Sequence, residues 1–492
     1  MAVKSCSPLL LESPPQDSGS ASSTKSPLRF PLLHAWLQRC DTHQKCQNLR
    51  TVEANFPTRV LDLSTPHSLR LVSGQDVFNF KGSSRRYIAL SHCWGNTAPG
   101  EIPRYCTTRQ NINSRETGQD FRVGSLPLTF RDAIEVSQGL GIRYLWIDSL
   151  CIIQGCPEDW IRESKRMEDV YAGAYCTIAA TSAANSEAGF LRHEIDNRHR
   201  TTNFAQEVDA APLNRRAWVL QERFLSRRIL HFSSYQIYFE CGSGIYSEDY
   251  TQMKSIVGTE KYIDLDPHFP DRLSSCYEGD VVKFLQSLLE KYSTRELSIP
   301  TDRAVALSGL LTRIGSTLGC EQSYGVIGKF LHRTLFWQWT SPRKKIKFDE
   351  DNKIPSWSWM GYEGGVGFYP IEFGKFGKFR KLHLTSDGGA LVTNVWEIED
   401  CGLQKDLGAD STAIRYQIVD LSGELRGWVT YDDESYSTLP LKWAVVLGKP
   451  RVRQELYLLV IRPRAGGDYE RLGIGMIEAG CISRKDVDVM VI

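Results

Sequence analysis

The chain has 492 residues and a formal net charge of +1, with 41% hydrophobic and 24% charged residues. This length suits two to four domains, and this composition is typical of globular proteins. A net charge near zero provides no general attraction to nucleic acid or to an anionic membrane. No apolar run reaches the roughly 18 residues that a membrane span needs. We therefore expect neither a nucleic-acid partner nor a membrane span.

The 13 cysteines are scattered along the chain without a Cys-x-x-Cys pair, which favours reduced thiols over a disulfide framework. The N-terminus lacks the apolar core of a secretory signal. The cytoplasm is therefore the expected location. Composition and apolar spacing predict five regions: a disordered N-terminus at 1–28, an irregular preface with one short helix at 29–80, an α/β domain at 81–245, a helical region at 246–345 and a β-rich region at 346–492.

Strand and helix patterns alternate through the third region. Short apolar strands are expected at Tyr87–Ser91, Arg143–Asp148 and Tyr175–Ala180. The helix after the first strand begins at Thr129-Phe-Arg-Asp132, which has the spacing of a capping box. This alternation predicts βαβ units and a parallel sheet.

The second helix of this region begins at Pro157, a residue that suits the first helical turn. A polar insertion follows at 183–213, and then a helix at Arg215–Leu225. Two more strands are expected, at Ile229–Phe232 and Gln236–Cys241.

Three helices are predicted in the fourth region, at Val281–Tyr292, Asp302–Ile314 and Tyr324–Trp339. The fifth region contains a clear strand at Leu456–Ile461. Four tryptophans are expected to form a core cluster rather than a binding surface: Trp337, Trp339, Trp357 and Trp359.

Polar residues follow the three apolar strands, at Ser91, Asp148 and Thr181-Ser182. Ligands of open parallel sheets bind beyond the carboxyl ends of the strands. The same residue types also serve as helix caps and loop starters. The pattern alone leaves both interpretations open.

A serine hydrolase and a reactive cysteine are two other catalytic possibilities. Ser91 and His92 are adjacent on a strand and point to opposite faces, and the Gly-x-Ser-x-Gly elbow is missing, so a Ser/His/Asp hydrolase is not expected. Cys93 and Cys151 are expected to be inert packing residues.

A zinc site in the preface is a further possibility. Cys40, His43 and Cys46, with His34 nearby, are residue types that suit zinc, but their spacing is not that of a common zinc finger. A structural role in the preface helix is favoured, and no metal is predicted.

Three segments carry a family resemblance: Tyr87-Ile-Ala-Leu-Ser-His-Cys-Trp-Gly95, Arg143-Tyr-Leu-Trp-Ile-Asp-Ser-Leu-Cys-Ile-Ile-Gln154 and Arg216-Ala-Trp-Val-Leu-Gln-Glu-Arg-Phe-Leu-Ser226. In order and spacing they resemble the blocks of the fungal heterokaryon-incompatibility (HET) domain. Flanking features, such as Asp302-Arg303 and Pro355-Ser-Trp-Ser-Trp359, also look like those of HET proteins. The resemblance implies a role in self/non-self recognition and regulated cell death.

HET domains are similar to Toll/interleukin-1 receptor (TIR) domains, which implies a TIR/flavodoxin-like α/β fold. Some TIR domains cleave NAD⁺ with a glutamate in a Trp-x-x-x-Glu pattern, which Trp218 and Glu222 match. The insertion before this helix is longer than in a plain TIR domain. Nicotinamide leaves NAD⁺ as a neutral molecule, so a single carboxylate suffices to stabilise the ribosyl cation. The resemblance therefore implies that Glu222 is catalytic, with NAD⁺ as substrate and no cofactor required.

Residues expected to bind the nucleotide are Ser91, His92, Trp94, Gly95, Asp148, Arg216 and Trp218. Arg216, at a helix start, suits a phosphate. Trp218 shares a helix face with Glu222 and serves either as a stacking platform or as a core residue. The alternative function is a non-catalytic signalling module that self-associates or binds other incompatibility proteins, in which Glu222 is a solvated or ion-paired surface residue.

Overall fold

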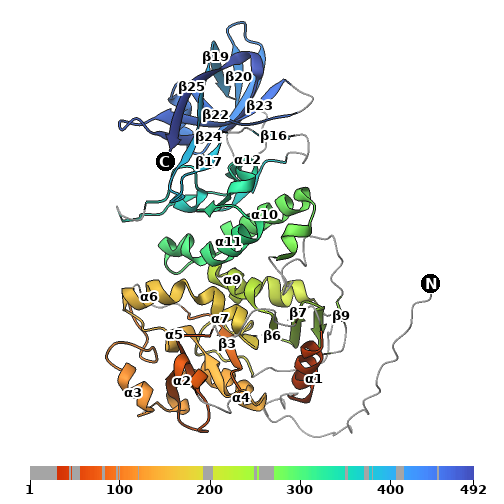
Figure 1. Ribbon diagram of the computed structural model, residues 1–492, viewed down its shortest axis with the longest axis vertical. Helices are drawn as coiled ribbons and strands as arrows, with labels where there is room; N and C mark the ends of the chain where they lie inside the picture. Colours follow the sequence, from red (N-terminus) through yellow and green to blue (C-terminus); the bar gives the residue numbers. More distant parts are fainter. Residues whose placement is uncertain are drawn as a thin grey trace, which may run out of the picture.

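The computed structural model places an α/β unit at one end of an elongated molecule and a β-rich unit at the other, with two long helices between them (Figure 1). The region predicted to be disordered, 1–28, lies outside the described residues. The structure describes residues 30–43, 46, 56–79, 84–95, 98, 100–119, 121–191, 203–248, 252–253, 271–349, 353–370, 376–378, 381–405, 415–450 and 454–492.

The sheet of the α/β unit has four parallel strands at its centre. Among the described residues, nine strands pair in the order β2-β1-β4-β3-β5-β6-β7-β8-β9, and β4, β3, β5 and β6 are mutually parallel. The predicted α/β class with a parallel sheet is confirmed. The strands are β1 (Arg59–Asp62), β2 (Arg70–Ser73), β3 (Tyr87–Ser91), β4 (Tyr144–Trp146), β5 (Cys176–Ala179), β6 (Arg228–Phe232), β7 (Ile237–Cys241), β8 (Gly244–Ser247) and β9 (Gln252–Met253).

Parallel strands β3, β4 and β5 are buried along their whole length, which explains why they read as continuous apolar runs. Helices connect and cover them: α2 (Gly74–Asn79), α3 (Ile112–Thr117), α4 (Leu128–Gly139), α5 (Asp148–Cys151), α6 (Pro157–Ser164), α7 (Met167–Gly173), α8 (Pro212–Arg215) and α9 (Ala217–Leu225). The short helix expected in the preface is present as α1 (Phe30–Asp41).

The expected start of the helix after β3 needs correction. The predicted capping box is wrong, because Pro127 precedes α4 and the Thr129 hydroxyl donates to the backbone oxygen of Asn185. The carboxylate of Asp132 accepts from the backbone N–H groups of Phe190 and Leu191. Both side chains therefore hold the loop that follows β5.

The helical region contains α10 (Glu278–Ser293) and α11 (Val305–Leu318), close to two of the three predicted helices. The third, Tyr324–Trp339, is wrong. Tyr324 and Gly325 both have positive φ, 40° and 84°, which no helix continues through. The segment forms short elements instead: β10 (Gln322–Ser323), β11 (Val326–Ile327), α12 (Leu331–Thr334) and β12 (Trp337–Trp339), followed by β13 (Lys344–Lys345), β14 (Tyr362–Glu363) and β15 (Val366–Phe368).

The predicted β-rich C-terminal region is confirmed, and its pairings close into a ring. Strand β22 pairs β18, which pairs β25, then β24, then β23, which returns to β22. The four predicted core tryptophans are all buried. The strands are β16 (Phe376–Lys378), β17 (His383–Leu384), β18 (Leu391–Ile398), β19 (Cys401–Lys405), β20 (Arg415–Asp420), β21 (Leu425–Tyr431), β22 (Trp443–Pro450), β23 (Glu455–Pro463), β24 (Tyr469–Glu478) and β25 (Ile482–Val491).

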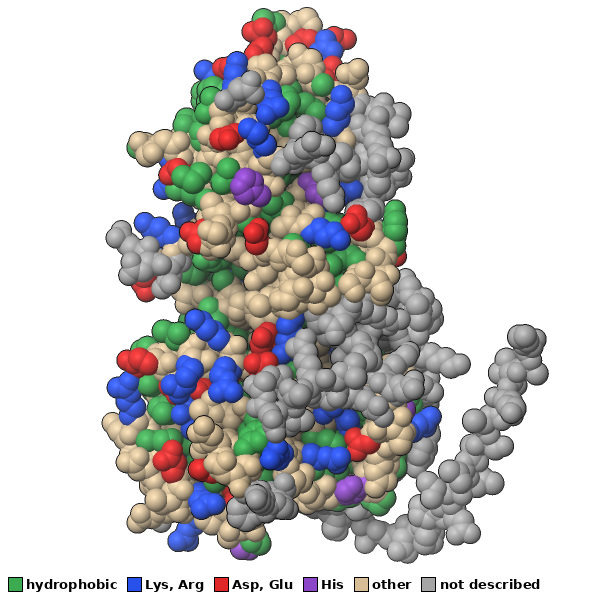
Figure 2. Space-filling model, viewed as in Figure 1, with side chains coloured by type: hydrophobic (Ala, Val, Ile, Leu, Met, Phe, Trp, Pro, Cys, Tyr) green, Lys and Arg blue, Asp and Glu red, His purple; other side chains and the backbone are tan. Residues whose placement is uncertain are grey.

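On the face shown in Figure 2, acidic and basic side chains are interspersed over both units. This distribution matches the net charge of +1. Within the described part of the chain, no helix has the length and apolar character needed to cross a bilayer.

Candidate active site

Glu222 contacts the carboxyl end of the first parallel strand. The Ser91 hydroxyl, at the last residue of β3, donates to Oε2 of Glu222 at 2.5 Å. Both residues are buried, with exposed fractions of 3% and 6%. Helix α9 runs directly into β6, which is parallel to β5, so the topology brings this helix back over the β3–β5 pair. The predicted catalytic glutamate therefore faces the strand edge rather than solvent.

Burial raises the pKa of Glu222 from 4.5 to about 7. The hydrogen bond from Ser91 and the charge of Arg216 oppose this rise, whereas the charge of Asp148 adds to it. The carboxyl group thus changes charge near neutral pH, the range in which a catalytic carboxylate is most useful.

Tyr171 is a site residue that the sequence did not identify. It lies on α7, where its spacing predicted only an apolar stripe. Its hydroxyl donates to the backbone oxygen of Leu90 at 3.2 Å and also makes a side-chain hydrogen bond with Glu222. Arg216 approaches from the start of α9 and donates to the backbone oxygen of His92. One carboxyl group is therefore surrounded by two hydroxyls and one guanidinium.

His92, Trp94 and Asp148 form a second group beside this one. The Trp94 indole donates to Oδ2 of Asp148 at 2.8 Å, and Nδ1 of His92 lies 3.8 Å from Oδ1. Burial lowers the pKa of His92 to about 4, although Asp148 opposes the shift. His92 is neutral at physiological pH and does not face the Ser91 hydroxyl, which is bound to Glu222. The geometry agrees with the absence of a serine hydrolase dyad.

Gly95 brings the loop after β3 against the loop after β5. Its φ is +92°, and a Cβ at this position would lie 2.6 Å from the Cβ of Asn185. Only glycine accommodates both the left-handed backbone and this close approach.

Trp218 is part of the hydrophobic core, one of the two roles, core packing or ligand stacking, that the sequence left open. It packs edge-on against Trp160, with ring centroids 5.7 Å apart, and hydrogen-bonds to Asp302. Burial raises the pKa of Asp302 to about 6, and the bond from Trp218 opposes that rise. Trp218 thus joins α9 to the segment that leads into α11.

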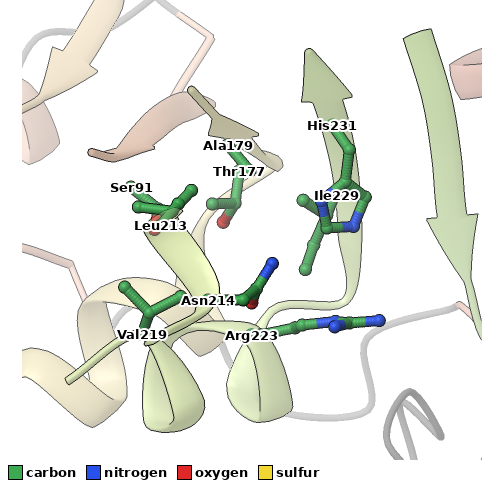
Figure 3. Close-up of a pocket in the computed structure, with 9 residues that line it drawn as sticks. All are labelled: Ser91, Thr177, Ala179, Leu213, Asn214, Val219, Arg223, Ile229 and His231. Atoms are coloured by element: carbon green, nitrogen blue, oxygen red, sulfur yellow. The ribbon is translucent and has the colours of Figure 1, made fainter. Parts of the chain in front are cut away.

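A small pocket lies between α9 and strands β3, β5 and β6 (Figure 3). The space in it that a water-sized sphere can occupy is about 10 Å³, roughly enough for one water molecule and far below the size of a ligand site. Two buried polar atoms of residues that line it, Nδ1 of His231 and Oδ1 of Asn214, have no hydrogen-bond partner among the described residues. Ser91 and Thr177 also line it. The sequence missed Asn214 and His231, since no motif marks either residue.

The remaining candidates lie elsewhere. Cys93 and Cys151 are buried, and burial raises the pKa of both thiols, to about 12 for Cys151. Cys40, His43 and Cys46 lie together at the end of α1, whereas Nε2 of His34 contacts the backbone oxygen of Gly139 at 3.1 Å.

The fold and the site define an α/β domain with a buried carboxyl group at the carboxyl edge of its parallel strands. Residues 87–222 match the family model described as Heterokaryon incompatibility protein (HET). This match confirms the HET domain expected from the three sequence blocks, and it covers less than a third of the 492 residues. No curated protein and no solved structure matches the chain.

Proposed function

We propose that this chain acts in fungal heterokaryon incompatibility and that its HET domain hydrolyses NAD⁺ at the nicotinamide–ribose bond, with Glu222 as the catalytic carboxylate. The observation that carries the proposal is the contact between Glu222 and Ser91 at the carboxyl end of β3. A glutamate pointing away from this edge would have no access to a ligand bound there.

The strand order supports a nucleotide site at this position. Numbered along the chain, the four parallel strands lie in the order second, first, third, fourth. Flavodoxin-like sheets share this order, and their ligands bind where the first and third strands diverge. Here that point lies between the ends of β3 and β5. We therefore extend the proposal to a TIR/flavodoxin-like domain.

The chemistry matches the residues present. Cleavage of the glycosidic bond leaves a ribosyl cation, which an ionised Glu222 would stabilise while water adds to the anomeric carbon. Arg216 supplies a positive charge for a phosphate, and the neutral His92 and Trp94 offer aromatic faces for a ring. The cleavage itself requires no cofactor.

In this structure the Glu222 carboxyl is buried and hydrogen-bonded, so the site would have to open before NAD⁺ could bind. Ser91 occupies one oxygen of Glu222, and the carboxyl group is almost fully buried. NAD⁺ would reach Glu222 only after this hydrogen bond opens. We propose that self-association or a partner drives that opening, as in TIR-like sites completed by a second subunit.

Free nicotinamide released from NAD⁺ by the purified full-length protein, across a range of protein concentrations, tests the proposal. We expect Glu222→Gln to reduce release by about 100-fold or more. Glu187→Gln, the same change at an exposed glutamate in the loop after β5, is the matched control and should retain activity. Equal release by wild type and Glu222→Gln would remove the catalytic role.

The burial of Glu222 also favours a second candidate, a non-catalytic signalling module in which this residue is a hydrogen-bonded core carboxyl. Overexpression in a fungal host separates the two. Toxicity that persists in Glu222→Gln, without nicotinamide release by the wild type at any concentration, would support the module.

A further inference from the structure

Four metal-ligand side chains converge outside the segment that matches the HET family. They are Cys40 at the end of α1, His43 and Cys46 just after it, and Cys241 at the end of β7. One ligand atom from each lies within 4.8 Å of all the others. The three thiols are fully or almost fully buried, with exposed fractions of 0%, 0% and 2%. We call this group the Cys₃His cluster.

Local backbone structure explains why the first three ligands share one side. The backbone N–H of His43 donates to the oxygen of Cys40 at 3.1 Å, and that of Cys46 donates to the oxygen of His43 at 3.0 Å. Each of these bonds joins two ligand residues that are three positions apart in the chain. This spacing returns each side chain to the same face of the chain.

The fourth ligand comes from a tight hairpin. Cys241 pairs with Gly244, which leaves Gly242 and Ser243 as the two turn residues between β7 and β8. The backbone N–H of Ser243 points at Sγ of Cys241 at 3.5 Å. An N–H group aimed at sulfur stabilises a thiolate, and such outer contacts are typical of metal-bound cysteines.

We propose that the Cys₃His cluster is a structural Zn²⁺ site. Thiolate and imidazole are the ligands that zinc prefers, and four protein ligands in a closed, buried set are typical of structural zinc. Zn–S bonds of about 2.3 Å in a tetrahedron place neighbouring sulfurs roughly 3.8 Å apart.

The ligand distances already approach that geometry. Nδ1 of His43 lies 3.8 Å from Sγ of Cys46 and 4.0 Å from Sγ of Cys241. The Ser243 hydroxyl lies 2.8 Å from the same nitrogen, and zinc would replace this contact. Zinc takes over Nδ1, and binding releases the thiol protons to solvent without any redox change.

Charge and packing around the cluster fit this assignment. Three thiolates and Zn²⁺ leave one net negative charge, and Asp41, next to Cys40 in the chain, pairs with the buried guanidinium of Arg228 at 2.7 Å. Trp36 of α1 stacks on Phe239 of β7, with centroids 5.8 Å apart. Figure 1 shows α1 against this edge of the sheet.

The consequence is a metal link across the whole HET domain. Its ligands lie before and after residues 87–222, so zinc would join the preface helix to the far antiparallel edge of the sheet. This assignment replaces the preference for a metal-free preface that the sequence alone favoured. It does not depend on NAD⁺ cleavage, because metal content is measured whether or not the protein is active.

The first measurement is elemental analysis of the full-length wild type, expressed in zinc-supplemented medium and purified under reducing conditions. We expect one zinc per chain, and less than about 0.1 would overturn the proposal. Replacement by Co²⁺ should give the thiolate charge-transfer band and the strong visible bands of tetrahedral cobalt. Octahedral cobalt, or a mass two hydrogens lower that reports a disulfide within the cluster, would also overturn it.

Variants assign the site to these ligands. Cys241→Ser and Cys46→Ser should each lower zinc content at least about tenfold. Cys106→Ser, at a buried thiol outside the cluster, is the matched control and should keep the metal. Full zinc content in Cys241→Ser would refute the assignment. If the ligand variants do not fold, the wild-type zinc content and cobalt spectrum still decide it.

Discussion

Replacing Glu222 with glutamine should stabilise the protein at high pH and leave its stability nearly unchanged at low pH. Burial raises the pKa of Glu222 from 4.5 to about 7. Glutamine has the same shape, accepts the Ser91 hydrogen bond and carries no charge. The substitution therefore removes only the cost of ionising a buried group.

The sign and magnitude follow from that pKa. The pKa of Glu222 in the folded protein lies above its value in the unfolded chain. Its protonated carboxyl therefore stabilises the folded state fully below pH 4.5, and this stabilisation is lost as pH rises through about 7. At about 1.4 kcal/mol per pH unit, the loss amounts to about 3 kcal/mol. Glu222→Gln has no carboxyl group to ionise. Near pH 8 its free energy of unfolding should therefore exceed that of wild type by up to about 3 kcal/mol.

Urea denaturation followed by tryptophan fluorescence, at several pH values between about 5 and 8, measures this difference. Glu240→Gln provides a control of opposite sign. Burial alone would raise the pKa of Glu240, but Arg223 and His231 overcome it and lower the pKa. This variant should lose about 1–3 kcal/mol at neutral pH, because it removes the buried carboxylate that pairs with both Arg223 and His231, while Arg223 keeps its ion pair with Asp209. Parallel stability curves for wild type and Glu222→Gln would refute the reasoning.

Two further substitutions test the packing of the two units. Arg471→Leu should destabilise the C-terminal unit by about 3–5 kcal/mol, since the fully buried guanidinium pairs with Asp432 at 2.7 Å; calorimetry showing a loss below about 1 kcal/mol would contradict this. Gly95→Ala should cost about 1–3 kcal/mol, because φ is +92° and a Cβ would meet Asn185 at 2.6 Å; an unchanged melting temperature would count against it.

The sequence predicted the central strands from a regular physical rule, whereas only the family resemblance put Ser91 and Glu222 into one expected site. Strands buried on both faces read as apolar runs, and parallel strands place their carboxyl ends at one edge. The family blocks then supplied the one helix whose glutamate returns to that edge. Composition and periodicity alone did not separate Glu222 from any other helical glutamate.

The missed residues depend on contacts that no local pattern encodes. Asn214 lies in the short helix α8, and His231 lies in β6 between the apolar residues Leu230 and Phe232. Cys241 joins Cys40 and Cys46 only because β7 and β8 form a hairpin beside α1. The sequence offered Cys40, His43 and Cys46, with His34 nearby, and favoured no metal, since the β7–β8 hairpin that supplies Cys241 was not visible in it.

Under the proposed function, Glu222 and Glu240 differ in the groups that surround their carboxylates. Both glutamates are buried in the same domain, and burial by itself would raise the pKa of each. Glu240 forms ion pairs with Arg223 and His231, which lower its pKa and keep its carboxylate ionised. Glu222 is hydrogen-bonded mainly by hydroxyl groups. Its ionised form therefore remains unfavourable while the Ser91 hydrogen bond is in place. A cationic ribosyl group beside Glu222 would stabilise that ionised form. The same environment that destabilises the free carboxylate would therefore favour the transition state of NAD⁺ cleavage over the empty site.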